Sequence, residues 1–214
     1  MMGERKRVPP KPIQKLLKID AYLTNLFCTI ADKFIPLRSL RTHYKVLEIS
    51  CHGLVWFGCW LASIWILWKP SLFEMQVNFY LGLIIDVVAV AVIKATVRRA
   101  RPTVNKDDMF MTVGPDKYGF PSGHVSRAVF IACFFTHLYP LSIIFYPPLL
   151  AWSVSVSVSR ILLRRHHILD VLAGALLGFV ESSLLSLLWL SKDSSTWLVS
   201  YISDEKIEGG EYHV

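Results

Sequence analysis

The sequence predicts an all-α integral membrane protein: a helical bundle with about five transmembrane helices, preceded by an amphipathic helix. Two observations support this prediction. The 214-residue chain is 53% hydrophobic with a mean hydropathy of +0.44, and only 18% of its residues are charged, against about a quarter in soluble domains. Apolar segments of roughly 20 residues, the length a helix needs to cross the hydrocarbon core of a bilayer, also occur several times.

Four segments of different character follow one another along the chain. Residues 1–12 are rich in proline and cations, which predicts a disordered basic tail. Residues 13–35 have apolar side chains at helical spacing but also charges near both ends and an aspartate within, which favours an amphipathic interfacial helix over a spanning one. Residues 45–190 form the predicted membrane-embedded domain, and residues 191–214 the predicted acidic C-terminal tail.

The embedded domain contains five segments that are predicted to span the membrane. They cover roughly residues 46–68, 75–97, 124–141, 143–161 and 168–190. If residues 13–35 also crossed the membrane, there would be six spans and the orientation of the chain would reverse. The sequence therefore leaves open which membrane face carries the loops described below, although the positive-inside rule favours the cytosolic face.

Charge and cysteine content narrow the class of partner. The net charge of +7 is uneven, with the basic stretch GERKRVPPKPIQKLLK near the start and the acidic stretch DEKIEGGEY near the end. A basic face of a membrane protein usually meets anionic headgroups, so we expect a membrane and no nucleic acid as partner. Four cysteines lie in apolar segments without metal-ligand spacing, which predicts small core residues rather than disulfides: Cys28, Cys51, Cys59 and Cys133.

Ionisable residues gather where four predicted segment ends share one side of the membrane. These are the end of the second span, the start of the third, the end of the fourth and the start of the fifth. A charge at the bilayer centre costs at least about 2.5–3.5 kcal/mol, so each such group requires a helix end or a partner. The residues at this face are Lys94, Arg101, His124, Arg160, His166 and Asp170.

Lys94 and Arg101 are seven residues apart, which places them on one side if the helix continues until Pro102 stops it. Two cations on one side suggest a bound anion. Other arginines near the segment ends, taken singly, are interpreted as side chains that reach back to the interface: Arg98, Arg99, Arg164 and Arg165.

The pentapeptide FPSGH, residues 120–124, precedes a predicted helix. At a helix N-terminus, Ser122 offers a hydroxyl and Gly123 an uncrowded backbone N–H, which are the parts of an anion site. His124 would stand beside that anion and could donate a proton.

His166 and Asp170 are four residues apart at the start of the fifth span. A carboxylate one turn away can accept one imidazole N–H and leave the other nitrogen as nucleophile or base. His167 is three residues from Asp170 and competes for the same carboxylate. A purely structural hydrogen bond is the alternative for either pair.

Three motifs occur in order at this face: K-x6-RP at 94–102, PSGH at 121–124 and SR-x5-H-x3-D at 159–170. Together they closely resemble the signature of the type 2 phosphatidic acid phosphatase family, whose fold and active site are shared with vanadium haloperoxidases and bacterial acid phosphatases. The resemblance covers roughly residues 45–190. The short chain and the stretches VIKATVRRARP and FPSGHVSRA are most similar to the small polyisoprenoid diphosphate phosphatases, including the presqualene diphosphate phosphatases.

The resemblance implies a metal-independent lipid phosphohydrolase without a cofactor, in the endoplasmic reticulum or nuclear envelope. His166 would attack the terminal phosphorus to form a phosphohistidine, and Asp170 would orient its ring. His124 would protonate the leaving oxygen and later activate water. The phosphate oxygens would be bound by Lys94, Arg101, Ser122, Gly123 and Arg160.

Several alternatives stay open at this point. The substrate could be a polyisoprenoid diphosphate, phosphatidic acid, lysophosphatidic acid or sphingosine 1-phosphate, and a catalytically silent family member would bind lipid phosphates or act as a scaffold. Vanadate peroxidase chemistry uses the same pocket, but a chain with several spans suits a lipid substrate better. Arg127 could touch a second phosphate or cap the site. Asp86, inside a span, is either functional or a buried partner for a cation.

Overall fold

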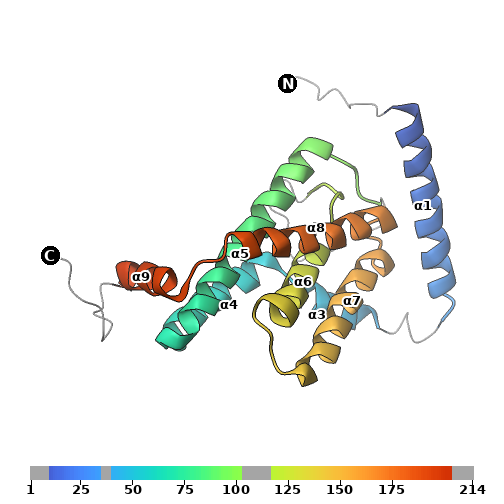
Figure 1. The fold of residues 1–214 in the computed structure, drawn as a ribbon. Helices are drawn as coiled ribbons and strands as arrows, with labels where there is room; N and C mark the ends of the chain where they lie inside the picture. Colours follow the sequence, from blue (N-terminus) through green and yellow to red (C-terminus); the bar gives the residue numbers. More distant parts are fainter. Residues whose placement is uncertain (1–9, 35–39, 103–116, 204–214) are drawn as a thin grey trace.

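The computed structural model describes residues 10–34, 40–102 and 117–203, and these form helices and no strand (Figure 1), which confirms the all-α prediction. The α-helices are α1 (Lys11–Ala31), α3 (Arg41–Ser50), α4 (Gly53–Ile66), α5 (Pro70–Val97), α6 (Gly123–Cys133), α7 (Tyr146–Leu162), α8 (Ile168–Leu187) and α9 (Lys192–Ser203). A π-helical turn, η2 (Phe134–Leu138), extends α6, and a short 3-10 turn, η3 (Ile143–Phe145), leads into α7.

Two helices of the described chain, α5 and α8, are long and apolar enough to cross a membrane. The helices over Thr42–Ser50 and Gly53–Ile66 would pass together as a third, although they are bent by 49°. α6 and α7 have 11 and 17 residues and fall below the length required. Two spans, or three with the bent pair, are therefore supported by length and composition, and the expected number of five stays a prediction.

The segment predicted to span the membrane at 46–68 is bent and not one straight helix, because the helix breaks between α3 and α4. His52 adopts an extended backbone, with φ −72° and ψ 133°. The carbonyl oxygen of Cys51 accepts a hydrogen bond of 3.0 Å from Nη1 of Arg127. A side chain from α6 thus binds a backbone group that an unbroken helix would bond internally.

Close packing of α8 on α6 brings the starts of both helices together. A Cβ atom on Gly174 would lie 2.6 Å from the carbonyl oxygen of Ser122, and one on Gly178 would lie 2.5 Å from that of Ser126. Only glycine allows the two backbones to approach this closely. Further along the bundle, α5 packs on α6 and η2 through a buried aromatic cluster. In it, the rings of Phe79 and Phe134 meet edge to face with their centroids 4.9 Å apart.

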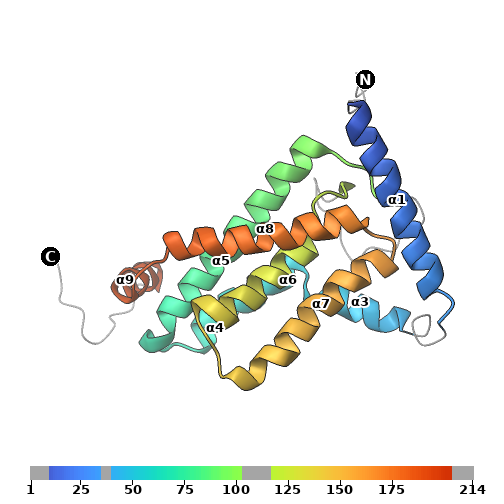
Figure 2. The same cartoon turned by 45° about the vertical axis from the view of Figure 1, so that its right-hand side comes forward.

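α1 lies across the ends of α7 and α8 (Figure 2). Its buried residues are Asp20, Thr24, Cys28 and Ala31. Its exposed residues include lysines, among them Lys15 and Lys18, and an apolar set: Ile13, Leu16, Ile19, Leu23, Leu26, Phe27 and Ile30. A helix is present over most of the predicted range 13–35, but its bounds are Lys11–Ala31, and the apolar residues on its outer side suit contact with lipid. Its location in the interface stays a prediction. The predicted tail lies outside the described residues up to residue 9, and Lys11 and Pro12 already belong to α1.

The C-terminal tail predicted for 191–214 is wrong for residues 192–203, which form α9. This helix packs on α5, far from α1 in both ribbon views (Figures 1 and 2). Val199 is 5% exposed and packs with Phe73 and Val77, so an apolar side of α9 stabilises the helix. The acidic stretch follows α9 and lies outside the described residues.

All four cysteines have free thiols, as predicted. Cys28, Cys51 and Cys133 are buried, but Cys59 is exposed on α4, so its interpretation as a core residue is wrong. The reason is that the whole of α4 is apolar, and the residue types do not show which side faces the bundle.

Asp86 is the buried partner of Arg127. Its Oδ2 lies 2.6 Å from Nη2 of Arg127, and the two side chains are 0% and 8% exposed. Arg127 is therefore held inside the bundle by Asp86 and the carbonyl of Cys51. Of the two alternatives left open for Asp86, the contacts favour a buried partner for a cation.

We expect Arg127→Ala to destabilise the fold, because it leaves the Asp86 carboxylate buried without its cation. Breaking a buried ion pair in this way typically costs about 3–5 kcal/mol. Thermal unfolding in detergent should show a clear loss, whereas Lys18→Ala, at an exposed position on α1, should change little. Equal unfolding midpoints for the two variants would contradict a stabilising role for the pair.

Candidate active site

The predicted site residues meet at one end of the bundle. Lys94 lies in the last turn of α5, Arg101 in the loop that follows, Ser122, Gly123 and His124 at the start of α6, Arg160 in the last turn of α7, His166 before α8, and Asp170 in its first turn. This is the arrangement that counting the spans predicted.

His166 is a buried imidazole surrounded by cations. It is 2% exposed, and burial together with the positive charges of Arg101, Lys94 and Arg160 holds its pKa well below the ordinary 6.5. The ring is consequently neutral at neutral pH, which is the form that can act as a nucleophile. His124 lies within electrostatic reach of both His166 and Arg160.

The orientation of His166 is set by a backbone carbonyl. Its Nδ1 lies 2.7 Å from the carbonyl oxygen of Gly119. A carbonyl only accepts, so Nδ1 donates and the neutral ring has its lone pair on Nε2. Asp170 Oδ2 lies 3.9 Å from the same Nδ1, too far for a hydrogen bond. The predicted direct bond is therefore wrong, because α8 begins only at Ile168 and the one-turn helical spacing does not apply to His166.

Asp170 instead anchors the start of α8. Its Oδ2 accepts the backbone N–H of His167 at 2.8 Å and lies 3.4 Å from His167 Nδ1. Its Oδ1 accepts a hydrogen bond of 2.7 Å from Nη1 of Arg99. His167 is thus nearer to Asp170 than His166 is, but the cations surround His166.

Two buried polar atoms near the start of α6 have no hydrogen-bond partner among the described residues: Ser122 Oγ and His124 Nε2. Ser122 precedes α6, where backbone N–H groups and the helix dipole favour an anion. Its own backbone N–H donates to the carbonyl of Asp170 at 3.0 Å, which ties the start of α6 to α8. The hydroxyl and the imidazole nitrogen are available to a bound phosphate.

The cations reach the site from separate elements. The expectation that Lys94 and Arg101 share one helix is wrong, because α5 ends at Val97 and Arg98 adopts a left-handed backbone with φ 50°. Arg101 instead donates from Nε to the carbonyl of Tyr118 at 3.3 Å. Arg160 is 1% exposed, with Nη1 3.4 Å from Glu48 Oε2 on α3.

Arg99, Gly119 and Asp20 are components of this site region that the sequence did not reveal. Arg99 is not a surface side chain as interpreted: it is 10% exposed and pairs with both Asp20 and Asp170. Gly119 lies one residue before the FPSGH stretch, and that adjacency was the one available signal. Asp20 is distant in sequence and carried no signal beyond being an acid within an apolar helix.

A comparison with protein families decides the identity. The PAP2 superfamily matches residues 76–193, which include all the residues above except Asp20 and Glu48. The chain belongs to the PAP2 superfamily. As a PAP2 protein it is a phosphatase, and its apolar helices make it an integral membrane protein.

Known relatives agree with this assignment. The PAP2 chain is 35% identical over 195 residues to the probable lipid phosphate phosphatase beta of Arabidopsis thaliana, covering 79% of this chain and 88% of that protein. The crystal structure of Aquifex aeolicus LpxE superposes with a TM-score of 0.56 at 21% identity, covering 76% of this chain and 93% of LpxE, and therefore shows the shared fold.

The low pKa of His166 predicts how the activity of the PAP2 site depends on pH. Because the folded pKa lies below 6.5, the nucleophilic neutral form persists as pH falls through 6.5 and is lost only at lower pH. We expect the acidic limb of kcat/KM, corrected for ionisation of the substrate, to lie below pH 6.5. A profile from about pH 5 to about pH 8 measures it, and a limb at or above 6.5 would contradict a neutral buried ring.

Proposed function

We propose that this protein removes phosphate from membrane lipid phosphates through a phosphohistidine formed on His166, without a metal ion. The observation that supports this best is a buried, neutral imidazole among three cations, with its Nδ1 held by Gly119. Such an arrangement leaves Nε2 free for an in-line attack on a phosphorus whose charge the cations offset.

The chemistry proceeds in two steps. Nε2 of His166 donates its lone pair to the terminal phosphorus, and the bond from that phosphorus to its leaving oxygen breaks. The leaving oxygen is the bridging oxygen of a diphosphate or the lipid ester oxygen of a monophosphate, and His124 gives it a proton. His124 then takes a proton from water, which attacks the phosphorus and breaks the P–N bond, releasing phosphate and restoring His166. Asp170 stabilises the site through the start of α8 and not through a direct bond to His166.

The phosphate oxygens are bound by groups from four elements. Lys94, Arg101 and Arg160 supply charge, while the Ser122 hydroxyl and the Gly123 backbone N–H supply directed donors. Their positive field stabilises the five-coordinate transition state, the task that metal ions perform in many phosphoryl transferases. Among the residues the structure describes, no group of three or more His, Cys, Asp and Glu side chains could hold a metal ion.

The proposed substrates are polyisoprenoid diphosphates such as farnesyl, geranylgeranyl and presqualene diphosphate. The stretches VIKATVRRARP and FPSGHVSRA support this class, and the Arabidopsis relative is named as a lipid phosphate phosphatase. Phosphatidic acid and sphingosine 1-phosphate are the competing substrates. The endoplasmic reticulum or nuclear envelope is the proposed location.

The decisive experiment measures phosphate release by detergent-purified protein in EDTA, with wild type beside His166→Ala. The substrates are farnesyl diphosphate, presqualene diphosphate, phosphatidic acid and sphingosine 1-phosphate. We expect release that disappears in the variant and is highest for the diphosphates. Strong inhibition by EDTA would overturn the metal-free mechanism. No release by well-folded wild-type protein would favour a lipid-binding or scaffold role.

A further inference from the structure

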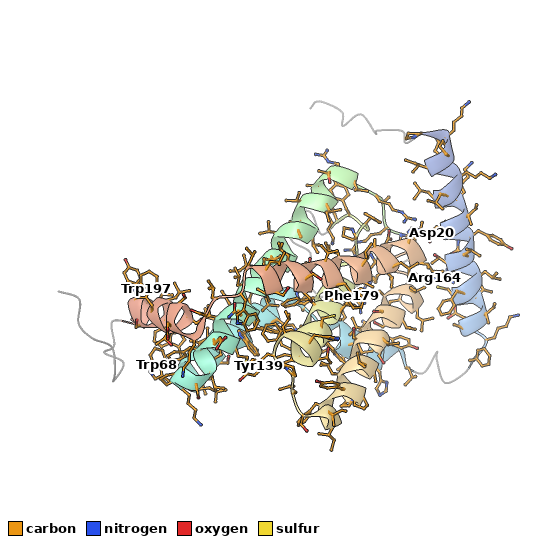
Figure 3. The ribbon with its side chains drawn as sticks, in the orientation of Figure 1. Asp20, Trp68, Tyr139, Arg164, Phe179 and Trp197 are labelled. Atoms are coloured by element: carbon orange, nitrogen blue, oxygen red, sulfur yellow. The ribbon has the colours of Figure 1, made fainter. Side chains whose placement is uncertain are left out.

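α1 is attached to the catalytic end of the bundle by its polar side chains. The backbone N–H of Leu169 donates to Oδ1 of Asp20 at 3.0 Å, and that of Ile168 donates to Oγ1 of Thr24 at 3.1 Å. The first N–H groups of a helix have no partner within it, so α1 supplies the acceptors that the start of α8 requires. In Figure 3, Asp20 lies where α1 faces the start of α8.

Arg99 connects Asp20 to the residues around His166. Its Nη2 lies 2.5 Å from Asp20 Oδ2, and its Nη1 lies 2.7 Å from Asp170 Oδ1. The side chains of Asp20 and Asp170 are 2% and 0% exposed, so the guanidinium is held between two buried carboxylates. A planar guanidinium suits such double pairing, because its N–H groups point in fixed directions.

The backbone of Arg99 also supports His166. Its carbonyl oxygen accepts the N–H of Gly119 at 2.8 Å, and the Gly119 carbonyl oxygen lies 2.7 Å from Nδ1 of His166. The space around Gly119 is limited, since a Cβ there would lie 3.3 Å from Asp170 Oδ2. A shift of Arg99 would therefore move both the acceptor that orients His166 and the carboxylate that anchors α8.

From these contacts we infer that Asp20 is a positioning residue of the active site, acting on His166 through Arg99, so that α1 is a working part of the phosphatase. This inference rests on the proposed role of His166. Asp20 does not touch the reacting atoms. It fixes the side chain of Arg99, and Arg99 fixes Gly119 and Asp170.

The test is Asp20→Asn in the full chain, purified in detergent and assayed on farnesyl diphosphate. Asparagine keeps an acceptor for Leu169 but presents Arg99 with an uncharged amide. We expect kcat to fall about 10- to 100-fold, the effect of a small displacement of a reacting group, with KM within about twofold. Asp20→Glu, which restores the carboxylate, should recover most of the lost kcat. Asp32→Asn is the matched control, because Asp32 follows the same helix with a 64% exposed side chain, and it should behave as wild type.

Action through Arg99 is tested by combining variants. In an Arg99→Gln background, Asp20→Asn should change kcat by less than about twofold, because the connection is already broken. If Asp20→Asn does not fold, Arg99→Lys keeps the charge and should still lower kcat at unchanged KM, since an ammonium cannot hold both carboxylates as the guanidinium does.

The outcomes separate this inference from the proposed function. Wild-type kcat in Asp20→Asn, or in Arg99→Lys if that variant replaces it, would overturn the positioning role while His166→Ala remained inactive. Additive losses in the double variant would also overturn it, because Asp20 would then act independently of Arg99. An active His166→Ala would instead refute the proposed function itself.

Discussion

Replacing His166 with alanine is expected to abolish phosphate release, with kcat falling by more than about 10⁴-fold, since a nucleophile and its partners act as a unit. The reason is that His166 combines burial, a fixed Nδ1 and three neighbouring cations. The measurement is single-turnover release from a radiolabelled substrate, with alkaline quenching to retain any phosphohistidine on the protein.

His167→Ala is the matched control for this variant. His167 lies 3.4 Å from Asp170 through Nδ1, but its backbone N–H makes the shorter contact at 2.8 Å, and alanine keeps that N–H. We expect labelled phosphoenzyme and turnover within about tenfold of wild type, the range of a supporting side chain. Loss of the phosphoenzyme in His167→Ala and its retention in His166→Ala would assign the nucleophile to the neighbouring position.

His124→Ala should lower kcat by about 10²–10⁴-fold, the usual contribution of a general acid and base. His124 begins the first turn of α6, and its buried Nε2 has no hydrogen-bond partner among the described residues. If it protonates the leaving oxygen, the loss should depend on the leaving group. The rate of the step that breaks the ester bond should fall most for an alkyl phosphate, whose alkoxide leaves poorly. It should fall least for p-nitrophenyl phosphate.

The comparison needs single-turnover rates, because His124 is also expected to activate water in the second step. His137→Ala provides the control, since His137 is exposed and lies in η2, beyond the end of α6 that is opposite His124. An equal loss for both leaving groups in His124→Ala would remove the general-acid role. It would leave His124 as a phosphate-binding or water-activating group.

Chain order and residue type were sufficient to predict that these ionisable residues gather at one end of the bundle. Charges at Lys94, Arg101, Arg160 and His166 are costly in a bilayer, so they had to lie at segment ends, and alternating crossings place those ends together. The helical class followed from the apolar composition. In lipid, the backbone N–H and C=O groups of a spanning segment must form their hydrogen bonds within the protein, and a helix does this within one segment. The resemblance of three motifs to a known signature then predicted the family, and the PAP2 superfamily match over residues 76–193 confirms that prediction.

Predictions from local spacing were less successful where a helix ended earlier or began later than expected. Arg101 does not continue the helix of Lys94, and His166 precedes the helix of Asp170, so neither pair has the relation that helical periodicity predicts. Helix ends depend on capping contacts from elsewhere in the fold, and the acceptors for the start of α8 come from α1.

Sequence patterns thus predicted the class of fold, the membrane environment and the candidate residues that lie together, but not Arg99, Gly119 or Asp20. Tertiary structure decided the partners of those residues: the carbonyl of Gly119 for His166, Arg127 for Asp86, and Arg99 between Asp20 and Asp170. The physical reason is that burial cost depends on residue type and segment length, both of which a sequence displays. A hydrogen bond depends on where two distant atoms meet within about 3 Å, which only the packed chain defines.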